Sequence, residues 1–279
     1  MKLNWKRGNM TTDKNFVRQQ LYAYPDVGRT GLCNMLFPWA RAVLFAHRRH
    51  CPLLAPQWTC FNRLGPWLRG ERDKRYYLGQ FTNNGYIKGF RKIVISLRCI
   101  KKVICENEDA VNDVETGIVV FRGIDGYFDK LCGKEDLLRR ELYKIVNPQI
   151  IGALKQLPKK FIGVHVRRGD FVATGQELPL DYYRRGVDLA RKKMSEDVPV
   201  LLFSDGVEKD LDCLRDCHNI VFMPPACALH DLLALSKASV IVGTNHSSFS
   251  EWAAFLGGMP SIWDESGRPP SRNFENIFV

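Results

Sequence analysis

The sequence predicts an α/β protein whose second half contains a doubly wound parallel sheet. Two observations support this prediction. From residue 161 onward, short β-branched or aliphatic runs alternate with segments of helical periodicity. The helical segments are long enough to connect parallel strands, and right-handed connections place helices on both faces of a sheet. The second half of the 279-residue chain is therefore expected to be Rossmann-like.

Five strands and four helices are expected in the second half. Each strand is a short apolar run, and a longer segment with a helical pattern separates it from the next strand. The expected strands are Phe161–Val166, Val198–Ser204, Asn219–Met223, Ser239–Thr244 and Pro260–Trp263. The expected helices span residues 181–195, 207–217, 229–237 and 248–256.

The first half follows a less regular pattern. A glycine-rich turn at residues 28–31 separates a first strand from a long helix, with Pro38 near the first turns of that helix. The expected strands are 20–24, 51–55 and 118–122, and the expected helices are 32–50 and 134–157, the second of which links to the second sheet. Two α/β domains with a cleft between them account for these elements most simply, with residues 1–150 in the first and 151–279 in the second.

The composition is that of an ordinary soluble globular protein, with 45% hydrophobic and 25% charged residues. The formal net charge of +11 predicts attraction to an anionic partner: nucleic acid, an acidic membrane surface or a phosphorylated ligand. The sequence has no RNA-binding aromatic motif and no recognition-helix signature, which disfavours nucleic acid. It has no His-Glu-x-x-His or aspartate-rich motif either, so no metal or other cofactor is expected.

Several features bear on where the protein works. The nine cysteines include no Cys-x-x-Cys pair, and we expect mostly buried, reduced thiols, as in a cytosolic protein. Residues 1–14 lack the apolar core of a signal peptide, and the apolar stretch at 35–46 is too short to span a bilayer, so a cytoplasmic protein without an anchor is expected. Residues 88–102 interleave basic and apolar side chains, which fits a helix lying on an anionic membrane and equally an ordinary surface helix.

Two arginines, a glycine and a carboxylate directly follow the buried strand at 161–166. Arg167 and Arg168 carry planar, permanently charged guanidiniums that match phosphate oxygens, so we interpret them as a diphosphate site. The alternative is a solvated pair of arginines with Asp170 as an ion-pair partner. His165 favours the first interpretation, because it lies in phase with Arg167 and gives a polar face to a strand otherwise suited to burial.

Further polar segments follow strands at the same edge of the predicted sheet. Ser204 and Asp205 end one strand, where the carboxylate either contacts a ligand or caps the next helix. The segment Ser247-Ser248-Phe249-Ser250 opens a helix whose free N–H groups and partial positive charge suit a phosphate. In the first half, Asn34 lies near the start of a helix from which it can reach across the cleft.

These motifs together resemble family 11 glycosyltransferases, the α-1,2-fucosyltransferases, and more loosely the α-1,6 and protein O-fucosyltransferases. The resemblance rests on His165–Phe171, Leu178–Tyr183, Phe203–Asp205, Asp231–Ser236, Ser247–Ala254 and Gly31–Phe37. In the last of these segments, Cys33 and Met35 replace the glycine and glutamine of the family's Gly-Leu-Gly-Asn-Gln-Leu-Phe pattern. Asn245 and His246 stand where the family more usually has Ala-Asn.

The resemblance implies a GT-B enzyme: two Rossmann-like domains with the active site in the cleft between them. It implies inverting, metal-independent transfer of L-fucose from GDP-fucose, bound by the second domain, to the 2-hydroxyl of a terminal galactoside, bound by the first. Arg167 is then the catalytic residue, because it stabilises the leaving diphosphate. The implied donor-binding residues are His165, Arg168, Asp170, Asp205, Ser247, Ser248, Phe249 and Ser250, with Asn34 and Glu177 on the acceptor or fucose side.

The proton acceptor and the glycan stay open at this point. Glu177, Asp170 and His165 are candidate bases, and a strongly dissociative transition state needs little base assistance. A galactose-containing glycan carried on a membrane lipid would suit the basic charge, with peripheral contact at the inner face of the membrane. Two alternatives are a related transferase with another GDP-sugar donor and a non-catalytic basic protein that binds membranes or nucleic acid.

Overall fold

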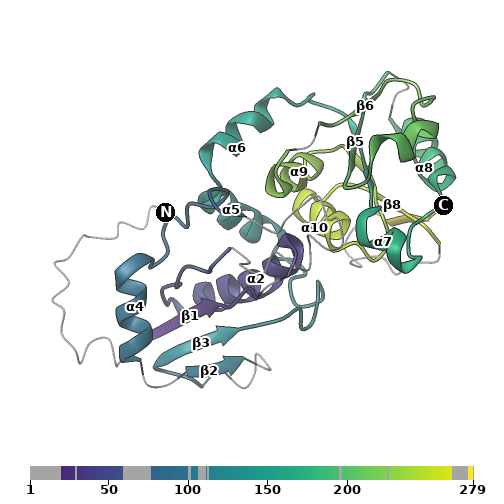
Figure 1. The fold of residues 1–279 in the computed structure, drawn as a ribbon. Helices are drawn as coiled ribbons and strands as arrows, with labels where there is room; N and C mark the ends of the chain where they lie inside the picture. The colour runs from purple at the N-terminus through teal and green to yellow at the C-terminus, as the bar shows by residue number, and fades with distance from the viewer. Residues whose placement is uncertain are drawn as a thin grey trace.

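The computed structural model describes residues 20–58 without 29, 77–99, 102–105, 111, 113–194, 197–224, 226–265 and 276–278. The predictions that concern residues 1–14, Arg29, Cys60 and residues 100–101 lie outside this part of the chain. The described chain forms two separate parallel β-sheets with helices packed on their faces (Figure 1).

The first sheet has three parallel strands in the order β1-β3-β2. Its strands are β1 (Leu21–Pro25), β2 (Lys102–Cys105) and β3 (Gly117–Phe121). Because side chains alternate along a strand, the sheet has two apolar faces. Helix α2 (Leu32–Arg49) covers one face through Phe45, and helix α4 (Gly89–Arg98) covers the other through Ile95. The start of α2 therefore lies at the carboxyl end of β1.

The second sheet has six parallel strands in the order β6-β5-β4-β7-β8-β9. Its strands are β4 (Ile162–Val166), β5 (Val200–Ser204), β6 (Ile220–Phe222), β7 (Val240–Val242), β8 (Ser261–Trp263) and β9 (Asn276–Phe278). The order reverses beside β4, because the chain runs outward through β5 and β6 and then returns to β7 on the other side. Open α/β sheets bind ligands at such a reversal, outside the carboxyl ends of the strands.

Two packed layers cover the second sheet. Ile162, Val164 and Val166 of β4 enter a core beneath α8 (Leu180–Lys193). On the opposite face, α9 (Ala228–Leu235) and α10 (Ser248–Gly257) share a core with Phe203 of β5. The doubly wound arrangement predicted for this half is confirmed.

Helices α5 (Glu135–Ile145) and α6 (Pro148–Ala153) connect the two sheets. The largest hydrophobic core runs through both halves of the chain, and α10 contacts both α2 and α5. These three helices lie side by side between the sheets in Figure 1. The domain boundary proposed at residue 150 falls within α6, and it stays a prediction.

Two predicted elements differ from the structure because of local backbone constraints. Residues 51–55 form no strand, since Leu53 and Leu54 make only isolated bridges, to Ala23 and Ile87. The helix predicted over 134–157 is interrupted, because Pro148 has no N–H to continue the hydrogen-bond pattern of α5. Pro148 instead opens α6, with Asn147 as its cap.

Three further differences concern short elements. The helix predicted over 207–217 is a 3₁₀ helix over Glu208–Leu214. The basic and apolar segment 88–102 forms α4 only as far as Arg98, and Lys102 begins β2. The short helix α7 (Gly169–Thr174) and the edge strands β2 and β9 were not predicted.

The cysteines are less uniformly buried than predicted. Among those in the described ranges, Cys33, Cys99 and Cys105 are buried, Cys51, Cys217 and Cys227 are half-buried, and Cys132 and Cys213 are exposed. No helix in the described part of the chain combines the length and the apolar character needed to cross a bilayer.

Candidate functional site

A cavity of about 820 Å³ lies between the two halves of the chain, at the carboxyl edge of the second sheet. The first half supplies residues 30–34 at the start of α2, together with Tyr77, Gln80, Ile124 and Tyr127. The second half supplies residues at the ends of β4 and β5 and at the starts of α7, α9 and α10. The predicted cleft between the two halves is therefore confirmed.

Arg167 lies in the cavity wall just after β4 and is held by two carboxylates. Its Nη2 donates to Asp170 Oδ1 at 2.8 Å, and its Nη1 lies 2.5 Å from Asp205 Oδ2. The guanidinium also lies over the ring of Phe171, 5.7 Å from its centroid. Because a guanidinium has five N–H donors, these two ion pairs leave three for a ligand in the cavity. The side chain is 28% exposed, so an anion in the cavity can reach it.

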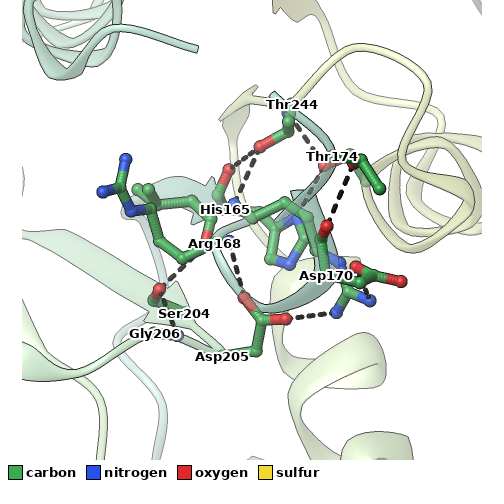
Figure 2. A network of polar contacts seen from close by, with 11 residues as sticks. His165, Arg168, Asp170, Thr174, Ser204, Asp205, Gly206 and Thr244 are labelled. Carbon is green, nitrogen blue, oxygen red and sulfur yellow. Dashed lines mark hydrogen bonds and ion pairs between the residues drawn. The ribbon is translucent and has the colours of Figure 1, made fainter. Parts of the chain in front are cut away.

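Asp205 connects the end of β5 to the arginine segment. Its Oδ1 accepts a hydrogen bond from the N–H of Arg168 at 2.7 Å, and its Oδ2 pairs with Arg167 (Figure 2). Gly169 makes this close approach possible, because a Cβ atom there would lie 2.3 Å from Asp205 Oδ2. The carboxylate lines the cavity and orients the arginine, and it does not cap the 3₁₀ helix that follows β5.

Thr244, which follows β7, joins the end of β4 to α10. Its hydroxyl donates to the carbonyl of His165 at 2.7 Å and accepts from the N–H of Arg167 at 3.0 Å (Figure 2). The hydroxyl of Tyr183 lies 2.8 Å away and fills the remaining lone pair. The N–H of Thr244 donates to Ser250 Oγ at 2.9 Å. This buried, fully bonded threonine fixes the backbone that carries Arg167 into the cavity.

His165 supports the opposite end of the same wall. Its Nδ1 lies 2.7 Å from Ser250 Oγ, and its ring stacks on Phe249 with 4.8 Å between the centroids. Burial, helped by the charge of Arg167, lowers the pKa of His165 to about 3. The imidazole is therefore neutral near pH 7 and a weak base, and it holds Phe249 and Ser250 in place.

The start of α10 forms the rest of this wall. Ser247, Ser248 and Phe249 line the cavity. The first N–H groups of a helix have no partner within the helix, and its N-terminus carries about half a positive charge. Arg167 and the start of α10 are thus two positive groups that face one cavity.

The wall from the first half is of a different kind, because its described residues carry no charge. Polar and aromatic side chains predominate, with Thr30, Asn34, Tyr77, Gln80 and Tyr127 among them. The Tyr77 hydroxyl accepts a hydrogen bond from the N–H of Leu32 at 2.9 Å and so holds the start of α2 in place. Such a surface suits a neutral ligand with several hydroxyl groups.

Tyr127 and Glu251 form a contact between the two halves. Tyr127 lies in the cavity wall and donates a hydrogen bond to Glu251 Oε2 on α10. Glu251 is only 5% exposed, and its burial raises its pKa to about 7, although the bond from Tyr127 opposes this shift. The sequence gives no signal for this pair, because the two residues are 124 positions apart.

Eight of the predicted site residues line the cavity: Asn34, His165, Arg167, Asp170, Asp205, Ser247, Ser248 and Phe249. Three do not. Arg168 contacts the site only through its backbone N–H, which donates to Asp205, and its Nε is buried without a hydrogen-bond partner. Ser250 is buried behind His165. Glu177 lies outside the wall, and its Oε2 is buried without a hydrogen-bond partner.

The described ranges contain no group of three histidine, cysteine, aspartate or glutamate side chains that could hold a metal ion. The charged groups of the cavity wall are Arg167 with its two carboxylates and Asp231 on α9. Asp231 belongs to one of the segments on which the family resemblance rests, although it was not predicted as a site residue. Its carboxylate lies 3.1 Å from Nδ1 of the neighbouring His230.

Sequence comparisons identify relatives of this chain. The family model described as "Glycosyl transferase family 11" matches residues 125–264, which is half of the chain. A galactoside alpha-(1,2)-fucosyltransferase 1 of Ateles belzebuth is 27% identical over 158 residues, which cover 51% of this chain and 41% of that protein. The protein of the same name in Homo sapiens is 26% identical over 155 residues, with the same coverage. The match thus spans about two-fifths of the length of these relatives.

Solved structures share the fold at low sequence identity. The alpha-1,6-fucosyltransferase NodZ co-crystallised with GDP superposes with a TM-score of 0.60 at 18% identity, covering 89% of this chain and 96% of that one. POFUT1 in complex with GDP superposes with a TM-score of 0.50 at 13% identity, covering 94% and 98%. The GT-B architecture implied by the sequence resemblance, with two α/β halves around one cleft, is confirmed.

Proposed function

The chain belongs to glycosyl transferase family 11, and we propose that it is an inverting fucosyltransferase that moves L-fucose from GDP-fucose to the 2-hydroxyl of a terminal galactoside. One observation carries the proposal. Arg167 and the start of α10 face the same cavity from the second half, while the first half lines it with uncharged polar groups. The anionic donor can thus bind the wall from the second half, and the neutral sugar acceptor can bind the opposite wall from the first half.

The donor side suits a nucleoside diphosphate. Three N–H donors of Arg167 and the free N–H groups at the start of α10 can meet the phosphate oxygens, and charge-assisted bonds of this kind contribute roughly 1.5 to 3 kcal/mol each. As the bond between fucose and phosphate breaks, negative charge grows on the diphosphate. Positive groups already in place stabilise that charge without reorganisation, so this wall can promote departure of GDP without a metal ion.

The acceptor side suits an alcohol that approaches from the first half. An acceptor on that wall would attack the sugar from the face opposite the departing diphosphate, which inverts the anomeric carbon. The galactoside specificity is supported by the relatives, which are galactoside alpha-(1,2)-fucosyltransferases. Asn34 at the start of α2 is the predicted contact on this side.

A panel of nucleotide sugars tests the donor. Thermal melting with GDP-fucose, GDP-mannose, UDP-galactose and GDP alone should show the largest stabilisation with GDP-fucose. A ligand at 100 times its dissociation constant stabilises by about 2.7 kcal/mol. Transfer assays with the same donors and lactose as acceptor should give product from GDP-fucose only. Product from another GDP-sugar and none from GDP-fucose would replace the donor assignment.

We also propose peripheral contact with an anionic membrane through α4, consistent with a lipid-linked acceptor and a cytoplasmic enzyme. Ile95 of α4 faces the sheet, whereas Phe90, Ile93 and Leu97 lie on the opposite side of the helix and are 56–79% exposed. Three large apolar side chains on one exposed helix face suit burial at a bilayer interface. The net charge of +11 adds attraction to anionic lipids.

Sedimentation with vesicles tests this contact. The full chain should bind phosphatidylserine-containing vesicles, less at high salt, and should bind phosphatidylcholine vesicles weakly. The double variant F90Q/L97Q should lose this binding. Val207→Gln is the control, because Val207 is also a highly exposed apolar side chain, at 67%, but lies outside α4. Equal binding by F90Q/L97Q and the control would contradict the proposed surface.

A further inference from the structure

The pair formed by Tyr127 and Glu251 offers a proton path from the cavity into the protein. The Tyr127 ring stacks on Phe37, with 4.8 Å between centroids, and this packing holds the phenol in the cavity wall. Its hydroxyl donates to Glu251 Oε2, so its oxygen still has lone pairs that can accept a hydrogen bond from a ligand. A hydroxyl group in the cavity can therefore reach Glu251 through Tyr127.

Glu251 is the one acidic side chain among the described residues that is more than nine-tenths buried. It lies in α10 next to Trp252, in the core shared by both halves, and no cation of the described chain forms an ion pair with it. Burying a carboxylate without a cation costs free energy, and proteins keep such groups mainly where they serve a function. Among the described residues, the hydrogen-bond partner of its carboxylate is Tyr127.

The surroundings favour proton uptake by Glu251. Burial raises its pKa to about 7, and the hydrogen bond from Tyr127 moderates this shift. Burial also raises the pKa of Tyr127, with Glu251 and Cys33 of α2 as further contributors, so the phenol keeps its proton when no partner takes it. Of the other helices packed on α10, α5 presents Arg139, which binds the carbonyl of Leu256, and α9 presents the His230–Asp231 pair.

We propose that Tyr127 and Glu251 together are the proton acceptor of the transfer reaction; the inference rests on the proposed function. The acceptor oxygen forms a bond to the anomeric carbon of fucose, and the bond from that carbon to the diphosphate breaks. The acceptor proton moves to the Tyr127 oxygen while the Tyr127 proton moves to Glu251 Oε2. The electron pair of the broken bond leaves with GDP, and Arg167 stabilises the negative charge that develops on the diphosphate.

The three bases considered from the sequence fit this role less well. His165 is buried, bonded to Ser250 and neutral with a pKa of about 3. Asp170 is paired with Arg167 on the donor side. Glu177 does not line the cavity. Tyr127, by contrast, belongs to the wall where the acceptor is expected to bind.

The variant Glu251→Gln separates proton transfer from structure. A glutamine oxygen can still accept the hydrogen bond from Tyr127, but it cannot take up a proton. General-base catalysis contributes about 100-fold or more, so kcat for fucose transfer should fall by at least that factor. The variant should melt no lower than the unmodified chain, and its GDP dissociation constant should stay close to that of the unmodified chain. Turnover within a few-fold of the unmodified chain would overturn the inference.

Tyr127→Phe provides the second variant, because it keeps the ring on Phe37 and removes the hydroxyl. It should lower kcat as strongly as Glu251→Gln, and the double variant should be no slower than either single one. Matched controls are Tyr143→Phe and Glu141→Gln on α5, whose side chains do not line the cavity; both should transfer fucose normally. Losses that multiply in the double variant would contradict a shared proton path.

The unmodified chain gives an independent test. Because Glu251 must be ionised to accept a proton, kcat should fall about tenfold per pH unit below about pH 7. A flat kcat between about pH 5 and 8 would overturn the inference even if both variants failed to fold. Absence of transfer from GDP-fucose by the unmodified chain would instead overturn the proposed function, and the inference with it.

Discussion

Replacing Arg167 by lysine would keep a positive charge at the cavity and remove the planar fork. In the structure the guanidinium pairs with Asp170 at 2.8 Å and with Asp205 at 2.5 Å, and three of its five N–H groups are left for a ligand. The lysine ammonium has only three N–H donors. If two of them bond the carboxylates of Asp170 and Asp205, one remains for the diphosphate. The substitution therefore removes directed bonds to the leaving group while the net charge of the site stays the same.

The magnitude follows from this donor count. Each lost bond to a charged oxygen is worth about 1.5 to 3 kcal/mol, so loss of one in the transition state lowers kcat/KM by about 10- to 150-fold. The fold should be little affected. Asp170 and Asp205 are 36% and 22% exposed, and partly exposed ion pairs of this kind contribute about 1 kcal/mol or less to the free energy of unfolding.

The assay measures fucose transfer from GDP-fucose to lactose at several donor concentrations, alongside melting curves. Arg215→Lys is a close control, because Arg215 also pairs with two carboxylates, Glu208 and Asp212, and stacks over Phe222 at 4.8 Å, yet it lies outside the cavity wall. It should transfer fucose at the normal rate. A kcat/KM for Arg167→Lys within threefold of the control would refute the donor-count reasoning.

Two further predictions follow from the geometry. Gly169→Ala would place a Cβ atom 2.3 Å from Asp205 Oδ2 and force that carboxylate away from Arg167. The affinity for GDP, measured by calorimetry, should therefore fall about tenfold or more. The control Gly152→Ala has open space around its Cβ position and should bind GDP normally. The second prediction concerns Glu251, whose pKa burial raises from about 4.5 in the unfolded chain to about 7 in the folded one. Between these two pH values the folded state therefore holds the proton more tightly than the unfolded state. The unmodified chain should therefore lose stability relative to Glu251→Gln as pH rises from 4.5 to 7, with no further change above; equal melting temperatures throughout would contradict the raised pKa.

Much of the donor side could be predicted from the sequence, for a physical reason. The strand predicted at 161–166 is a continuous apolar run, and the structure forms it over Ile162–Val166. In a parallel sheet the carboxyl ends of the strands meet at one edge, so residues that follow different strands converge. Arg167, Asp205 and Ser247 were expected together on that basis, and they line one cavity.

The parts that were missed depend on long-range packing. Tyr127 lies in a stretch with no predicted element, and its contact with Glu251 exists only because α10 packs between the two halves. The role of Asp205 as a partner of Arg167 required the close approach that Gly169 permits, which no spacing along the chain reveals. The exposed apolar face of α4 could not be predicted for a related reason. Only the fold shows that Ile95 packs on the sheet and that Phe90 is exposed.

Linkage analysis of the transfer product tests the central claim most directly. The unmodified chain would be incubated with ¹³C-labelled GDP-fucose and a panel of terminal galactosides, and the product examined by NMR. The proposed function predicts an α-linked fucose whose anomeric carbon correlates with position 2 of the terminal galactose. Fucose attached at another position, or a β-linked product, would contradict the proposed reaction.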